Sequence, residues 1–256
     1  MTRRMQRRIA TSRRRCALGR ALWVWIGCCW MWAYSAGVTR EQYLAPVPPD
    51  LQTGLALFNP SVRTRSVSLT LLDEQGQPRT GPGLVNLVEL ELTPGVQYPR
   101  YLHDLFGPGW NGAVSSVRLE STGDVYAFFQ IHDSSLSRCD GINLLRQPAN
   151  GFFVPIPGKP DESHWLGLVN PSQAENTIAL SWEGAGKEPS PSYNLVLPAH
   201  GCALLRLADI FPGNAGGYLR LSGSFPFTGS LAVDGADQLV VAGLMDPLKA
   251  AQRLMV

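Results

Sequence analysis

The sequence predicts an all-β protein: two tandem β-sandwich modules, produced by an internal duplication, that follow an N-terminal signal segment. Two observations predict this fold class. First, an apolar run followed by Asn-Pro-Ser occurs twice, at residues 55–61 and 166–172, with similar segments around both copies. Second, short runs of alternating apolar and polar residues are separated by turns rich in glycine and proline, which is typical of sandwiches and barrels.

The duplication has a period of about 110 residues, because the landmarks around Asn-Pro-Ser recur in one order. The paired landmarks include 43–48 and 152–157, 102–106 and 207–211, and the closing segments 125–133 and 239–246. The alignment gives these expected boundaries: signal peptide or signal anchor 1–37, module 41–134, connector 135–150, module 151–247 and tail 248–256. Each module is predicted to be a sandwich of short antiparallel strands.

The predicted strands are the segments in which apolar side chains recur at every second residue. Successive side chains leave a strand on opposite sides, so a period of two marks a half-buried strand. The inward sets are Val67, Leu69 and Leu71 in 66–72, Val88, Leu90 and Leu92 in 85–92, and Ile178, Leu180 and Trp182 in 177–182. The chain also holds 26 glycines and 20 prolines, which favours frequent turns over long helices.

Asn-Pro-Ser is predicted to end a strand in each module. Pro60 and Pro171 lack an N–H and cannot continue a central ladder. The side chains of Asn59 and Asn170 can bond nearby backbone groups in the turn that follows. The alternative interpretation is a ligand-binding loop that is displayed twice.

One short helical turn is expected in each module, at 101–106 and 207–211, and such short helices persist only when they are packed. The residues expected to face inward are Leu102, Leu105 and Phe106 in the first turn, and Leu207, Ile210 and Phe211 in the second. Asp104 and Asp209 occupy matching positions, whereas the neighbour of the first is His103 and that of the second is Ala208. An aspartate that recurs without its histidine is predicted to be a capping or turn residue.

These motifs resemble the immunoglobulin-like β-sandwich modules that occur in tandem in secreted bacterial proteins and mostly lack an assigned activity. The resemblance covers about residues 43–246 and is carried by Ala-Leu-Phe-Asn-Pro-Ser, the strand and turn Leu-x-Leu-x-Asp-x-x-Gly at 69–76, Leu-Thr-Pro-Gly at 92–95 and Asp-Leu-Phe at 104–106. The second copy has Glu-Gly-Ala-Gly at 183–186 in place of the Asp-x-x-Gly turn. The resemblance brings no functional residue with it.

The N-terminus predicts export. Eight arginines within residues 1–20 precede an uncharged apolar run at 21–36 and the small residues Ser35, Ala36 and Gly37, the order of a secretory signal. We expect a periplasmic or extracellular protein, with cleavage near residue 37 or, if the segment stays uncleaved, a membrane anchor. The details leave a twin-arginine signal at 12–15 and a lipoprotein signal ending at Cys28 open as alternatives.

Without this segment the chain is acidic. The full sequence has 22 basic and 20 acidic residues, and the leader removes eight of the basic ones. The remaining net charge is −6, and no cluster of Lys and Arg is left, so nucleic acid is not an expected partner. Two cysteines remain, Cys139 and Cys202, and an oxidising compartment would permit a disulfide between them. The alternative is two free thiols.

No catalytic motif or cofactor-binding motif appears, and we expect a non-catalytic protein without a cofactor. A calcium ion held by Asp133, Asp140 and nearby carbonyls is one alternative, although the spacing matches no EF-hand loop. The sequence favours a structural or adhesive envelope protein that binds other proteins. A carbohydrate-binding module is the second hypothesis, because several aromatic residues fall outside the core alternation: Tyr98, Tyr101, Trp110, Tyr126 and Trp165. A row of exposed aromatic side chains would favour the second hypothesis.

Overall fold

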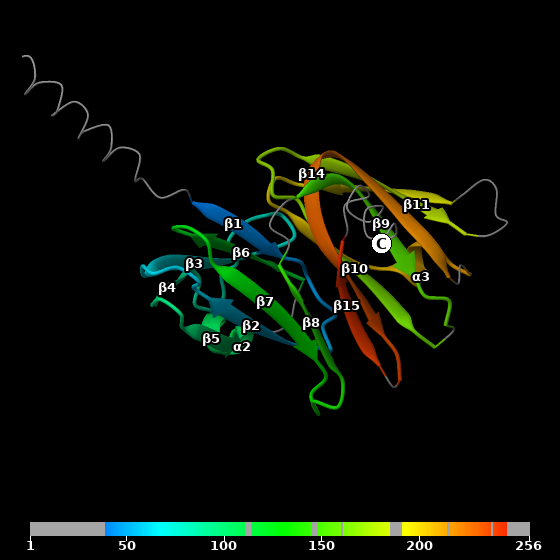
Figure 1. Ribbon diagram of the computed structural model, residues 1–256. Helices are drawn as coiled ribbons and strands as arrows, with labels where there is room; N and C mark the ends of the chain where they lie inside the picture. The colour runs from blue at the N-terminus through cyan, green and yellow to red at the C-terminus, as the bar shows by residue number, and fades with distance from the viewer. Residues whose placement is uncertain are drawn as a thin grey trace, which may run out of the picture. The chain divides into compact units, whose positions relative to one another are not determined.

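The computed structural model describes residues 39–110, 114–144, 148–159, 161–184, 191–213, 216–236 and 238–244. The predicted signal segment 1–37 and the tail 248–256 lie outside these residues. The described part of the chain is built almost entirely of antiparallel β-strands, so the predicted all-β class is confirmed (Figure 1).

The first module consists of eight strands and one helical turn. These elements are β1 (Arg40–Leu44), β2 (Gln52–Phe58), β3 (Arg65–Leu72), β4 (Val88–Leu92), β5 (Gln97–Tyr101), α2 (Leu102–Phe106), β6 (Ser116–Ser121), β7 (Tyr126–His132) and β8 (Cys139–Asn143). They form two sheets, with strand orders β1-β6-β3-β4 and β5-β2-β7-β8. Inward side chains of both sheets share one hydrophobic core, which makes the module a sandwich.

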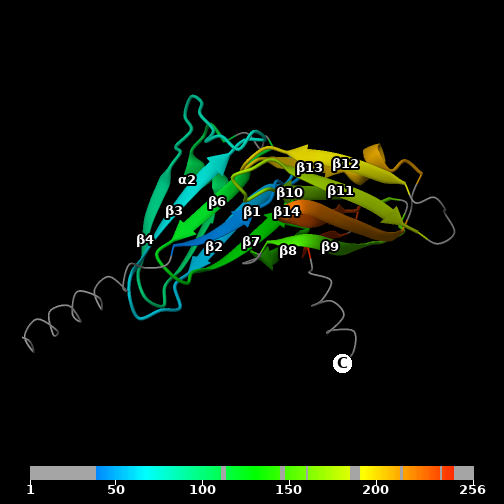
Figure 2. The same cartoon turned by 90° about the horizontal axis from the view of Figure 1, so that it is seen from above.

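The second module repeats this arrangement. Its elements are β9 (Ala149–Ile156), β10 (Ser163–Val169), β11 (Asn176–Glu183), β12 (Ser192–Leu197), β13 (Cys202–Arg206), α3 (Leu207–Ile210), β14 (Gly217–Asp234) and β15 (Leu239–Gly243). One layer has the order β9-β14-β11-β12 and the other has the order β15-β14-β10-β13. Each strand of the first module therefore has a counterpart in the second, which can be followed in Figures 1 and 2.

The two modules differ at the corner between their layers. β6 and β7 are separate strands in the first module, whereas their counterparts are the two halves of the single 18-residue strand β14. The pairing register of β14 shifts between Ser222 and Phe227, and Asn176 holds this bend through hydrogen bonds to the N–H and C=O of Phe225. A bulge of this kind bends a strand so that it can serve two layers.

The alignment of the closing segments was wrong. Segment 125–133 corresponds to the second half of β14, and β15 is the counterpart of β8. The N–H of Leu144 bonds to the C=O of Ala127, and the N–H of Leu244 bonds in the same way to the C=O of Gly229. The predicted connector 135–150 therefore contains β8, an edge strand of the first module, and the second module begins with β9 at Ala149.

Asn-Pro-Ser ends a strand in both modules, as predicted, and the two copies share one hydrogen-bond network. Nδ2 of Asn59 donates to the C=O groups of Arg63 and Leu92, both at 2.8 Å, and its Oδ1 accepts from the N–H and hydroxyl of Ser61. Asn170 makes the same bonds with the corresponding residues: Ala174, Leu197 and Ser172. Both amides are fully buried, so they tie the strand end to the core.

Candidate ligand-binding face

One broad sheet face of the first module is exposed to solvent. We call it the open face: the outward side of β5-β2-β7-β8. Along β2 the side chains of Leu55 and Leu57 enter the core, while Gly54, Ala56 and Phe58 point outward. Cross-strand pairing places Gln130, Phe128 and Tyr126 of β7 beside these three residues, in that order.

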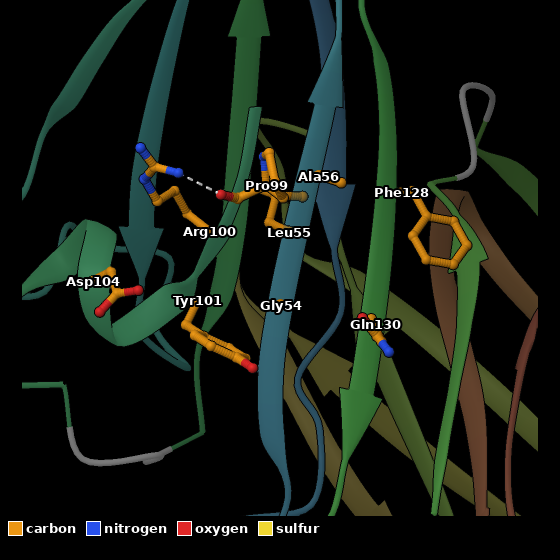
Figure 3. A pocket seen from close by; sticks show the side chains of 9 residues that line it. All are labelled: Gly54, Leu55, Ala56, Pro99, Arg100, Tyr101, Asp104, Phe128 and Gln130. Carbon is orange, nitrogen blue, oxygen red and sulfur yellow. Dashed lines mark hydrogen bonds between the residues drawn. The ribbon is translucent and has the colours of Figure 1, made fainter. Parts of the chain in front are cut away.

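A groove lies on the open face above β2. Its floor is formed at Gly54 and Ala56, where no side chain extends beyond Cβ, and its volume is about 410 Å³. One wall contains Pro99 and Tyr101 of β5 with Asp104 of α2; the other contains Phe128 and Gln130 of β7. Figure 3 shows the two walls on either side of β2. The groove is open to solvent and follows β2 from Gly54 to Ala56.

Four aromatic side chains of the open face are exposed. Their exposed fractions are 37% for Phe58, 38% for Tyr101, 41% for Phe128 and 49% for Tyr126. The rings of Phe58 and Tyr126 stack with their centroids 6.4 Å apart and their planes within 16°. Exposed aromatic groups in one patch are unusual on a sheet surface that has no partner, and they supply flat apolar surface for a ligand.

Two imidazole rings hold Tyr101 in place. His103 stacks on its ring at 5.3 Å, and His132 meets it edge-on at 5.5 Å. Nδ1 of His132 lies 2.7 Å from the C=O of Asp133. Because a carbonyl only accepts, this nitrogen carries the proton. Nε2 of His103 lies 3.1 Å from Oδ1 of Asp104, so the histidine also orders the carboxylate at the end of the groove.

Phe128 is positioned by the glycine beside it. A Cβ on Gly141 of β8 would lie 2.6 Å from Cζ of Phe128, so the ring lies against the backbone of β8. The missing side chain at position 141 thus lets the ring lie over β8 instead of over the groove.

Arg100 also lines the groove, but its side chain leaves β5 on the side of the sheet opposite to the open face. It pairs with Leu55, whose side chain is in the core, and strand alternation therefore turns Arg100 away from Pro99 and Tyr101. Its guanidinium lies 4.4 Å from the ring of Tyr98 and donates to the C=O of Pro99 at 2.7 Å. Figure 3 shows this donor contact.

The equivalent face of the second module is buried beneath the first module. We call it the covered face: the outward side of β13, β10, the second half of β14, and β15. Val169, Thr228 and Ser230 occupy the positions of Phe58, Tyr126 and Phe128, and all three are buried. A Cβ on Gly167, the counterpart of Ala56, would collide with the C=O of Pro46 in the first module.

Side chains of both modules form this contact. The core of the first module also contains Ala232, Leu239 and Val241 of the second. A smaller cluster combines three residues of the first module with two of the second: Tyr43, Ala45, Leu72, Val169 and Cys202. The turn at Gly76 packs so closely on Ala199 that a Cβ there would collide with its carbonyl oxygen.

Polar side chains also stabilise the contact between the two modules. The guanidinium of Arg138, in the turn between β7 and β8, bonds to Asp133 within its own module. It also reaches Asp234 at 2.5 Å and the C=O of Gly235 in the second module. Asp140 accepts a 2.7 Å hydrogen bond from the N–H of Val241, which satisfies a backbone donor on the edge strand β15.

These contacts give the calcium hypothesis no support in the described residues. The carboxylate of Asp133 already accepts from Ser135, Ser137 and Arg138, and that of Asp140 accepts from two backbone N–H groups. The hydrogen bond from Ser137, followed by that from Arg138, holds the pKa of Asp133 well below its usual range. In the described part of the chain, no three His, Cys, Asp or Glu side chains are grouped closely enough to hold a metal ion.

The disulfide predicted between Cys139 and Cys202 is wrong for this structure, because both cysteines are free. Cys139 is exposed at the start of β8, opposite His132. Cys202 lies in the second module beside Val169 and is buried on the covered face, against residues of the first module. Burial raises the pKa of the Cys202 thiol to about 12.

The helical turns formed as predicted, but their aspartates are not caps. α2 buries Leu102, Leu105 and Phe106; in α3, Leu207 is buried, Ile210 is half-buried, and Phe211 is buried just after the helix. Asp104 and Asp209 lie in the first turns, and neither helix has a side-chain hydrogen bond at its N-cap. The capping half of the prediction is therefore wrong, whereas both aspartates do lie in a helical turn.

The aromatic residues chosen from the sequence divide into two groups. Tyr101 and Tyr126 are exposed on the open face, whereas Tyr98, Trp110 and Trp165 pack against the core of the first module. Sequence reasoning missed Phe58 and Phe128. Their signal was present in the alternation, because each occupies the outward phase of its strand beside inward residues such as Leu57 and Phe129.

Comparisons with known proteins add little to these observations. No family model and no curated protein matches the sequence. A crystal structure described as Thermotoga maritima 1070 is 14% identical with a TM-score of 0.33, over 38% of this chain and 94% of that one. A structure of allantoicase is 9% identical with a TM-score of 0.19, over 78% and 73% of the two chains. The exo-chitosanase CsxA of Amycolatopsis orientalis is 9% identical with a TM-score of 0.18, over 80% and 25%. Similarity at this level says nothing about the function of this chain. The resemblance to immunoglobulin-like modules of secreted bacterial proteins stays a prediction.

Among the described helices, none combines the length and apolarity that crossing a membrane requires.

Proposed function

We propose that this protein is an exported, non-catalytic binding protein of the cell envelope and that the open face of its first module binds carbohydrate. The observation that carries this proposal is the set of four exposed aromatic side chains around the groove: Phe58, Tyr101, Tyr126 and Phe128. Sugar rings present apolar C–H faces that stack on aromatic rings, and their hydroxyls need polar neighbours. Asp104 and Gln130 supply such neighbours in the groove walls.

The second module supports this interpretation by contrast. It has Val169, Thr228 and Ser230 where the first module has three of its exposed aromatics, and it buries them against the first module. The aromatic residues are therefore not needed to build this sheet. Their presence on the solvent-exposed copy alone favours a binding role over a structural one.

A glycan array tests the proposal with the full mature chain. We expect binding of the wild-type protein to one or more glycans, and at least tenfold weaker binding by Tyr126→Ala and Phe128→Ala. Tenfold corresponds to about 1.4 kcal/mol, within the usual cost of losing an aromatic binding contact. Tyr193→Ala and Tyr218→Ala remove similarly exposed rings from the second module and serve as matched controls.

A protein partner at the same face is the second candidate. Tyr, Phe and Trp are enriched in protein interfaces as well as in sugar sites, so the aromatic patch is compatible with adhesion through another protein. Wild-type protein that binds no glycan but attaches to cell surfaces, and loses attachment in Tyr126→Ala, would favour this candidate. Attachment by both controls and loss only in open-face variants would locate the interface.

A further inference from the structure

We propose that the groove binds an internal stretch of a polysaccharide chain that lies along β2 and carries no acidic groups. This inference rests on the proposed carbohydrate-binding function and specifies the class of ligand and its direction on the protein. Three features support it: the course of the groove along β2 toward the stacked pair of Phe58 and Tyr126, its polar groups, and the residue that occupies the equivalent position in the second module.

The shape of the groove favours a chain over a single sugar. The floor is the backbone of β2 at Gly54 and Ala56, and both walls follow neighbouring strands. The stacked pair of Phe58 and Tyr126 continues the apolar surface beyond Ala56. From Gly54 to Phe58 the strand rises by about 13 Å, and the groove is open rather than enclosed. A ligand along β2 therefore extends over several sugar rings and is not held by its end.

The charges on the groove disfavour acidic sugars. Asp104 is the acidic residue among those that line the groove, and the guanidinium of Arg100, which also lines it, is turned toward Tyr98. His103 is the titratable group beside Asp104, and Gln130 stands on the opposite wall. A carboxylate accepts hydrogen bonds from hydroxyls, and an amide both donates and accepts. A carboxylate or sulfate on the ligand would instead meet the like charge of Asp104.

In the second module a large side chain occupies the position equivalent to the floor of the groove. Trp165 stands where the first module has Gly54, since they pair with Arg206 and Tyr101 at equivalent registers. A Cβ added at Gly54 would have no neighbour closer than 3.9 Å, so a larger side chain there enters the groove without straining the sheet. Gly54→Trp copies the second module and is expected to block the ligand.

Affinity electrophoresis with soluble polysaccharides tests the inference on the full mature chain. The probes are neutral glucan, xylan and mannan, two polyuronates (pectate and alginate), and free monosaccharides as competitors. We expect retardation by at least one neutral chain and none by the polyuronates. Free monosaccharides should compete at least a hundredfold more weakly than short oligosaccharides of the retarding chain.

Gly54→Trp should abolish this retardation, while Tyr218→Ala should leave it unchanged. Gly54→Val is the second blocking variant, because valine is well tolerated in strands, and melting curves confirm that each variant is folded. Asp104→Asn should weaken binding about tenfold, since the neutral amide is a poorer acceptor for hydroxyls than the carboxylate.

The outcomes separate this inference from the proposed function. Stronger retardation by a polyuronate, competition by monosaccharides as effective as that by chains, or unchanged binding by folded Gly54→Trp and Gly54→Val would overturn the inference. In those cases carbohydrate binding itself would stand. Absence of binding by wild-type protein to every polysaccharide and to the glycan array would overturn the proposed function as well.

Discussion

The open face of the first module and the covered face of the second occupy equivalent places in two modules of the same topology. The open face carries Phe58, Tyr126 and Phe128, and its groove has a floor of Gly54 and Ala56. The covered face carries small or aliphatic residues at the same three positions and lies against the first module. Equivalent sheet faces thus have different side chains because they meet different surroundings.

The comparison suggests a division of roles between the modules. The second module contributes Ala232, Leu239 and Val241 to the core of the first, and Asp234 to the contact with Arg138. It therefore supports the first module, whose open face remains available to a ligand.

The largest difference is expected in the alkylation rates of the two cysteines. Cys202 is buried on the covered face, whereas Cys139 is exposed at the edge of the open face. Because its pKa is raised to about 12, only about 1 in 10,000 Cys202 side chains is a thiolate near pH 8, and the thiolate is the reactive form. In mature protein, iodoacetamide followed by mass spectrometry should modify Cys139 alone until denaturant is added. If neither cysteine is alkylated until a reductant is added, the two are joined in a disulfide after all.

Separating the modules should have the largest effect on stability. A fragment of residues 148–247 exposes the apolar covered face, including Leu239 and Val241. Loss of these two burials costs about 4 kcal/mol, which lowers the melting temperature of a module this size by roughly 20 °C. Calorimetry and sedimentation should reveal a less stable fragment that self-associates. A monomeric fragment with the melting temperature of the intact protein would mean that the contact contributes nothing.

The buried side-chain amides of Asn59 and Asn170 should contribute equally to the free energy of unfolding. Asn59→Ala and Asn170→Ala each remove the side-chain donor to one buried carbonyl, that of Leu92 or Leu197, so each should lower the free energy of unfolding by about 2 kcal/mol. Chemical denaturation measures the two values, and Asn194→Ala, at an exposed position of β12, is the control. A large loss of unfolding free energy for only one of the two variants would show that the two networks are not equivalent.

Acid should weaken the protein in two stages. Burial lowers the pKa of His164, so its neutral form is favoured in the folded state and stability falls as the pH drops below about 6.5. The lowered pKa of Asp133 gives a contribution that is present above about pH 4 and is lost as the pH falls through the folded-state pKa. Melting temperatures across this range should show both stages.

His164→Gln should remove the first stage alone. Arg138→Ala should reduce the second stage, because Asp133 loses its cationic partner. A melting temperature that stays constant between about pH 7 and pH 5 in the wild-type protein would contradict the assignment to His164.

The smallest effect is expected at the helical turns. Asp209→Ala should cost about 0.5 kcal/mol, because the carboxylate only complements the N-terminal end of a short helix and makes no capping bond. Asp104→Ala should cost a similar amount of stability but should also weaken ligand binding, since Asp104 lines the groove. Denaturation and affinity electrophoresis on the same two variants separate these effects. A loss of about 2 kcal/mol at Asp209 would indicate a capping role after all.

The sequence by itself determined the all-β class, the inward residues of several strands and the repeat of the Asn-Pro-Ser strand end. Alternation is a local property, so Val67, Leu69 and Leu71 could be assigned to the core without knowledge of their partners. Asn-Pro-Ser ends its strands for reasons that lie within three residues. The buried end of each network could not be predicted, because Leu92 and Leu197 lie 33 and 27 residues away along the chain.

Tertiary structure alone decided which surfaces are open. Alternation assigns a residue to the outward side of a sheet, but it cannot tell whether another module covers that side. Phe58 and Val169 are both outward residues that precede the asparagine of their motif; one is exposed and the other is buried. The boundary of the first module was missed for the same reason. β8 is recognised as its edge strand only through pairing with β7, and only the tertiary structure places Cys139 at an exposed strand start and Cys202 in the buried contact between the modules.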